Sequence, residues 1–146
     1  MSFNQVNPQI ISPVTAKLIP VRTPARTFAI LKANAQAHNL DGFMACFHQK
    51  FSTNLGSQLI EKTNPEVFKK WAAEAMNKFS DWISSGKPLE LGEKEFDGKK
   101  LSYTIPDLLG EGGEPNNSGK LGIDFLFQGH VGGDRWLVSG LSKPAN

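Results

Sequence analysis

The feature that most constrains the fold is a predicted β-hairpin spanning residues 120–142. In its first arm apolar side chains occupy every second position, at Leu121, Ile123, Phe125 and Phe127. This is the period of a strand that buries one face. Residues 132–134 are Gly-Gly-Asp, which favours a turn because glycine adopts positive φ without steric cost. Trp136 and Val138 then continue the apolar face, so the segment predicts two paired strands.

A second hairpin is predicted upstream, around the dipeptide Asp97-Gly98. This pair is typical of a tight hairpin turn, and it separates residues 91–96 from residues 99–105. The following segment, residues 107–119, is rich in glycine, asparagine and proline. We expect a long loop there, of the kind that is often functional or mobile in compact domains.

Three helices are predicted before the hairpins. The first begins near Thr23, a capping residue followed by Pro24, and ends near Asn39. The second is short, is capped by Asp41, and extends to Phe51. The third has Asn64 as its cap and carries a broad apolar stripe as far as Ile83. Residues 52–63 connect the last two helices and include room for one short strand.

The chain of 146 residues is long enough for one domain with a substantial core. We expect an extended arm over residues 1–22, which contain three prolines, a single α+β domain over residues 23–142, and a tail over residues 143–146. The predicted architecture is three N-terminal helices packed on a curved antiparallel sheet of two hairpins.

Charge and cysteine content exclude several classes of protein. The 16 basic and 14 acidic residues are spread along the chain, which argues against a nucleic-acid-binding surface. The single cysteine, Cys46, lies in an apolar run and is expected to be a buried, inert thiol. We expect no metal, no cofactor, no membrane span and no secretory signal, and therefore a cytoplasmic protein.

Two segments resemble a known superfamily. Residues 30–51, ILKANAQAHNLDGFMACFHQKF, and residues 134–142, DRWLVSGLS, are similar to the nuclear transport factor 2-like superfamily, which includes ketosteroid isomerase and polyketide cyclases. The resemblance implies a cone-shaped, cystatin-like roll whose interior forms a pocket. It also implies either a small apolar ligand or catalysis in that pocket, and a homodimer formed through the sheet.

Nine apolar or aromatic side chains are the candidate pocket walls: Phe28, Leu31, Trp71, Phe79, Trp82, Tyr103, Phe125, Phe127 and Trp136. A stripe of this kind is also what an ordinary core requires, and in a cone the same helix face serves both purposes.

The polar candidates are Asp124, Tyr103 and His130. Asp124 would have a raised pKa and could act as a base if its face lined the cone. The alternation of the strand instead favours an outward, solvated Asp124. Three functions follow as hypotheses. They are a ligand-binding protein without assigned catalysis, an isomerase, dehydratase or cyclase that uses Asp124 as its base, and a protein-interaction module that dimerises through its sheet.

Overall fold

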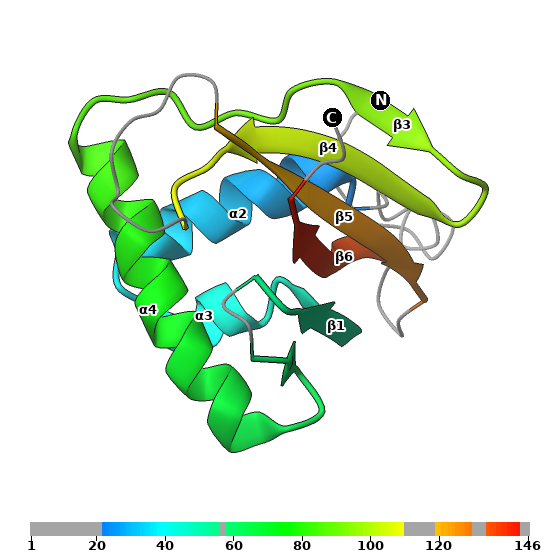
Figure 1. Cartoon of the computed structure of the whole chain (residues 1–146), viewed down its shortest axis with the longest axis horizontal. Helices are drawn as coiled ribbons and strands as arrows, with labels where there is room; N and C mark the ends of the chain where they lie inside the picture. The colour runs from blue at the N-terminus through cyan, green and yellow to red at the C-terminus, as the bar shows by residue number, and fades with distance from the viewer. Residues whose placement is uncertain (1–21, 56–57, 110–118, 130–133, 144–146) are drawn as a thin grey trace, which may run out of the picture.

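The computed structural model describes residues 22–55, 58–109, 119–129 and 134–143. Three helices lie against one curved sheet, and the longest helix runs along the side of the molecule (Figure 1). The elements in chain order are α2 (Pro24–Gln36), α3 (Leu40–Met44), β1 (Phe47–Thr53), β2 (Ile60–Glu61), α4 (Pro65–Ser84), β3 (Lys94–Phe96), β4 (Lys100–Pro106), β5 (Lys120–Gln128) and β6 (Arg135–Ser142). The predicted α+β class is confirmed.

The sheet differs from the prediction in its composition. It has six strands in the order β2-β1-β6-β5-β4-β3, whereas two hairpins alone would give four. The two predicted hairpins form the half from β6 to β3, where all pairs are antiparallel. The other half adds β1, which runs parallel to β6, so the sheet is mixed. Parallel strands are joined by a long connection and not by a short turn, so no turn motif in the sequence predicts the pairing of β1 with β6.

The capping chemistry fixes the first helix. Thr23 is the N-cap of α2, and its Oγ1 accepts a hydrogen bond from the backbone N–H of Arg26 at 3.1 Å. The helix ends when His38 adopts a φ of 54° and the N–H of Asn39 donates back to the carbonyl of Asn34 at 2.9 Å. This is the usual left-handed termination of a helix, here made by a residue other than glycine.

The predicted second helix is wrong beyond Met44. Helix α3 has only five residues, and Asn39 rather than Asp41 is its cap, since Asn39 Oδ1 accepts from the N–H of Gly42 at 3.1 Å. Residues 47–51 belong to strand β1 instead. A large irregularity in the pairing of β1 with β6 separates the pairs Phe47–Val138 and Ser52–Gly140.

Helix α4 follows the prediction closely. Pro65 stands at its first position, although Asn64 makes no side-chain capping bond. Its buried face packs on the core through Phe68, Ala72, Ala75, Met76, Phe79 and Ser80. These residues recur at the helical spacing of three and four positions, so they form one stripe on the helix that packs against the core.

Both predicted hairpins are present. In the β3–β4 turn Gly98 has a φ of 98°, and Asp97 Oδ1 accepts bonds from the N–H groups of Lys99 and Lys100, each at 2.9 Å. In β5, Leu121, Ile123 and Phe125 are buried against the helices, as the alternation predicts.

The core is centred on Phe47, which contacts four aromatic rings. The centroids of Phe43, Phe51, Phe68 and Trp71 lie between 4.8 and 5.8 Å from its own. Two buried hydroxyls tie distant segments to β6: Thr27 Oγ1 donates to Trp136 O at 2.6 Å, and Thr53 Oγ1 donates to Leu141 O at 2.8 Å. The first and last parts of the described chain are thereby joined in one core.

Several predicted segments fall outside the described residues. Of the arm over residues 1–22 only Arg22 is described, and of the loop over residues 107–119 only 107–109 and 119. Within the tail, Lys143 is described. None of the helices that the structure describes combines the length and the apolar character needed to cross a membrane.

Candidate functional site

A cleft of about 850 Å³ opens between α4 and the ends of the strands. One wall is the face of α4 that carries Val67, Lys70, Trp71, Glu74, Ala75 and Lys78. The opposite side comes from β1, β2 and the residues between them, through Thr53, Leu55, Gln58 and Ile60. The remaining lining residues lie in or just after β4, β5 and β6: Asp107, Leu109, Leu121 and Lys143.

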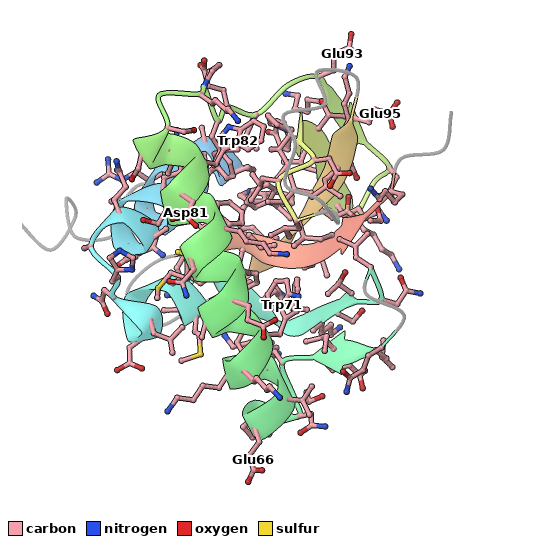
Figure 2. The ribbon with its side chains drawn as sticks, turned by 60° about the vertical axis from the view of Figure 1, so that its left-hand side comes forward. Glu66, Trp71, Asp81, Trp82, Glu93 and Glu95 are labelled. Atoms are coloured by element: carbon pink, nitrogen blue, oxygen red, sulfur yellow. The ribbon has the colours of Figure 1, made fainter. Side chains whose placement is uncertain are left out.

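The residues that α4 contributes to the cleft are spaced so that apolar and charged side chains share one stripe of the helix. Its six residues recur at intervals of three and four, so they form one stripe on the surface of α4. The stripe overlaps the edge of the buried face at Ala75 and reaches solvent at Lys70, Glu74 and Lys78. Figure 2 shows Trp71 on the side of α4 that faces the sheet, away from Glu66 at the end of the helix. The cleft therefore has an apolar floor and a charged rim.

Asp107 is the least exposed charged side chain in the lining of this cleft. Its side chain is 16% exposed, and its Oδ2 forms an ion pair with Nζ of Lys143, a side chain that is 60% exposed. The other oxygen, Oδ1, is buried and has no hydrogen-bond partner. An unpaired buried carboxylate oxygen is energetically costly, so this atom is disposed to accept a hydrogen bond from a molecule in the cleft.

Of the nine predicted pocket residues, the structure places Trp71 in the cleft wall. Four others, Phe28, Leu31, Phe79 and Phe125, are buried core side chains. Trp82 is partly buried near the end of α4, where its Nε1–H donates to Pro88 O at 3.0 Å. Phe127 and Trp136 form an edge-to-face pair with ring centroids 5.6 Å apart, and Phe127 is 46% exposed.

The structure does not bring the polar candidates together. Tyr103 pairs with Ile123 across β4 and β5, on the helix-facing side, and its ring meets Phe125 edge-on at 5.7 Å. Burial raises the pKa of the Tyr103 hydroxyl. Asp124 projects from the other side of β5 and pairs with Lys100, Oδ2 to Nζ, at 3.5 Å. His130 lies outside the described residues.

Sequence reasoning missed Asp107, Lys143 and the charged residues of α4. Asp107 directly follows the strand residues Ile105 and Pro106, and a polar residue at the end of a buried strand is a signal that could have been used. Lys143 follows β6 in the same way. Their proximity could not be inferred, because it depends on which strand ends meet.

His48, outside the cleft, is 4% exposed and neutral by its bonding pattern. Its Nδ1 accepts from the backbone N–H of Lys50 at 3.0 Å, and its Nε2 lies 3.3 Å from Phe127 O, to which it donates. Protonation of Nδ1 would destroy the first bond. Burial is the largest cause that lowers the pKa of His48, and the charges of Lys50 and Lys62 lower it further.

We expect the protein to lose stability as the pH falls below about 6.5, the ordinary value for histidine. Since the pKa of His48 is lower in the folded chain, the unfolded chain binds more protons in this range. Stability is therefore fully present above the unfolded pKa and is lost as the pH falls toward the folded one. Urea unfolding measured between pH 8 and pH 5 should show a flatter pH dependence for His48→Gln.

The matched control for this experiment is Gln49→Ala, which truncates the exposed neighbour of His48 in β1 and removes no titratable group. This variant should keep the pH dependence of the parent. An unchanged slope in His48→Gln would show that His48 is not the group responsible.

Within the part of the chain that the structure describes, no group of three His, Cys, Asp or Glu side chains is arranged to hold a metal ion. Cys46 is buried, and burial raises the pKa of its thiol to about 11 against the smaller opposing effects of Arg22 and Lys62. The thiol is therefore almost entirely protonated at neutral pH and a poor nucleophile.

Neither a protein-family model nor a curated protein matches this sequence. Solved structures do resemble it. A de novo designed protein with a curved β-sheet is 14% identical and aligns with a TM-score of 0.46, over 81% of this chain and 92% of that one. A nuclear transport factor 2-like protein of unknown function from Cytophaga hutchinsonii is 11% identical, with a TM-score of 0.37, over 85% and 90% of the two chains.

A protein of unknown function with a cystatin-like fold, from Nostoc punctiforme, is 11% identical with a TM-score of 0.41, over 79% of this chain and 82% of that one. These likenesses concern the fold alone. Two of them carry the nuclear transport factor 2-like and cystatin-like descriptions of the superfamily that residues 30–51 and 134–142 resemble.

Proposed function

We propose that this protein binds a small molecule in the cleft between α4 and the strand ends. The ligand has an apolar body and one polar group that donates a hydrogen bond. The observation that supports this proposal most directly is the buried, unpartnered Oδ1 of Asp107 in the lining of the cleft.

The cleft suits an apolar body. Its volume falls within the range of about 300–1,000 Å³ that is common for small-molecule sites. Leu55, Ile60, Leu109 and Leu121 line it together with Trp71. The Trp71 ring is held by its aromatic neighbours, since its centroid lies 5.2 Å from that of Phe51 and 6.1 Å from that of Phe68. A rigid aromatic wall of this kind favours flat or aliphatic ligands.

The rim supplies further selectivity. Lys70, Lys78 and Lys143 line the cleft together with Glu74 and Asp107, and the Nζ of Lys78 donates to Leu109 O at 3.4 Å. With Asp107 already paired to Lys143 through Oδ2, its free Oδ1 is the acceptor that fixes the orientation of a ligand hydroxyl or amine. The proposal includes no catalytic step, because Asp124 lies in a different part of the sheet. Self-association through the sheet and a cytoplasmic location stay predictions.

The test begins with native mass spectrometry of protein purified without denaturation from its host. We expect an additional mass of a few hundred daltons that is released on unfolding. The same preparation, once stripped of its ligand, should bind N-phenyl-naphthylamine saturably, since this neutral fluorophore combines an apolar body with one N–H donor. The released compound should displace it. No bound compound together with no saturable binding of the fluorophore would refute the proposal.

A further inference from the structure

A second group of polar side chains lies outside the cleft. It is found where Arg22, just before α2, runs beside the start of β6. The N–H of Arg22 donates to Asp134 O at 2.9 Å, and the N–H of Trp136 donates to Arg22 O at 2.8 Å. These two bonds form a parallel bridge that pairs Arg22 with Arg135. Paired residues of neighbouring strands project from the same face, so the two arginine side chains start side by side.

The next strand extends this row. Strands β5 and β6 lie side by side (Figure 1), and Gln128, at the end of β5, pairs with Arg135, at the start of β6. Both side chains carry a buried polar atom without a hydrogen-bond partner: Oε1 of Gln128 and Nε of Arg135. A buried guanidinium N–H without an acceptor is unusual in folded proteins and costs free energy. Because Gln128 and Arg135 are paired, their two unsatisfied atoms indicate that a polar group able to hydrogen-bond with them is absent from this position.

A third cation approaches from the turn after β2. Lys62 is half-buried, and its Nζ donates to Phe47 O at 2.5 Å. Burial lowers the pKa of Lys62, and the charge of Arg135 lowers it further. Arg22 and Lys62 in turn both act on the thiol of Cys46. The charges of Lys62 and Arg135 therefore act on each other across a partly buried region.

The acids of the described chain do not neutralise this group. Within residues 22–55, 58–109, 119–129 and 134–143 the ion pairs join Lys100 to Asp124 and Lys143 to Asp107. Asp134, the neighbour of Arg135, is exposed and forms an ion pair with neither arginine. Arg22, Lys62 and Arg135 thus carry positive charges without an ion-pair partner among the described residues, and these three side chains and that of Gln128 remain partly accessible to solvent.

We propose that Arg22, Lys62, Arg135 and Gln128 form a binding site for a small oxyanion, the phosphate or carboxylate group of a free molecule. Two neighbouring guanidinium groups offer planar pairs of N–H donors that match the oxygens of either group. The oxyanion accepts a hydrogen bond from Nε of Arg135 and relieves the repulsion between Lys62 and Arg135. The carboxamide of Gln128, turned to present its NH₂, supplies a further donor.

The test is thermal unfolding of the whole protein at pH 7.5 in sodium phosphate or sodium acetate, against sodium chloride of equal ionic strength. At saturating oxyanion we expect the Tm to rise by about 3 °C or more over the chloride value. Calorimetric titration with phosphate should show that Arg135→Gln lowers the affinity at least about tenfold. Phosphate and acetate distinguish the two oxyanion classes, and a response to either supports the site.

Two further variants keep the result interpretable. Lys62→Met should also abolish the response, because it removes one of the positive charges that the oxyanion would neutralise. Lys99→Gln removes the same charge from the exposed β3–β4 turn and should respond as the parent does. Equal Tm values in all three salts, or an equal rise in the parent and in Arg135→Gln, would overturn the proposal. A dimer that Arg135→Gln dissociates, without any response to free oxyanions, would also overturn it.

Discussion

Replacing Phe47 by alanine is expected to lower the free energy of unfolding by about 3–5 kcal/mol, the range for removing a large buried aromatic side chain. The ring of Phe47 is fully enclosed and lies within 5.8 Å, centroid to centroid, of four other aromatic rings. Because these rings come from α3, β1 and α4, the cavity would loosen three elements at once. Urea titration followed by circular dichroism measures the change.

Phe96→Ala is the matched control, since it removes the same side chain from a position that is 61% exposed. Its expected effect is within about 0.5 kcal/mol, as for most surface substitutions. If the two variants lost similar amounts of stability, Phe47 would not be at the centre of the core.

The second large effect concerns the cleft. Val67→Trp is expected to weaken the binding of N-phenyl-naphthylamine by more than about tenfold, which corresponds to about 1.4 kcal/mol. Val67 is half-buried and lines the cleft from the first turn of α4, so an indole ring at this position occupies the space that a ligand body would need. Because the position opens onto the cleft, the larger side chain does not overpack the core. Fluorescence titration measures the affinity.

Lys69→Trp places the same indole on an exposed position of the same helix, outside the cleft lining. It should bind the fluorophore as the parent does, and both variants should retain the circular dichroism spectrum of the parent. Equal affinities in Val67→Trp and the parent would show that the fluorophore binds elsewhere.

The elements that could be predicted from sequence are those encoded by neighbouring residues. Thr23 and Pro24 predict the start of α2, because they are typical of a helix N-terminus, and the Asp97-Gly98 dipeptide predicts the first hairpin. The alternation from Leu121 to Phe125 also identifies the buried face of β5 correctly. Each of these signals extends over a few residues, which is why no knowledge of the tertiary structure was needed.

Strand β1 was missed for a physical reason. The apolar residues Phe43, Met44, Phe47 and Phe51 have a spacing that suits a helix. In the structure the irregular pairing of β1 with β6 buries His48 and exposes Gln49, so the simple alternation of a strand is interrupted there. A bulged strand therefore has the apolar pattern of a helix when only its sequence is considered.

The cleft was predicted only in part because its walls meet through tertiary structure. The aromatic stripe of α4 was correctly identified as apolar, but whether a given ring faces the core or the cleft depends on how the helix is rotated against the sheet. Trp71 lies at that boundary, and Phe79 lies wholly in the core. Asp107 and Lys143 are separated by more than thirty residues, and they meet because β4 and β6 end on the same side of the molecule.

The parallel pairing of β1 with β6 has a consequence for how the protein is made. The hydrogen bond from Thr53 Oγ1 to Leu141 O spans 88 residues of chain. During synthesis β1 leaves the ribosome long before β6, and until β6 emerges its edge and the aromatic side chains behind it have no partner. Such long-range pairing is slow and leaves apolar surface open to aggregation. We expect this chain to complete its fold only after translation of β6, and to depend on chaperones more than a helical protein of equal length.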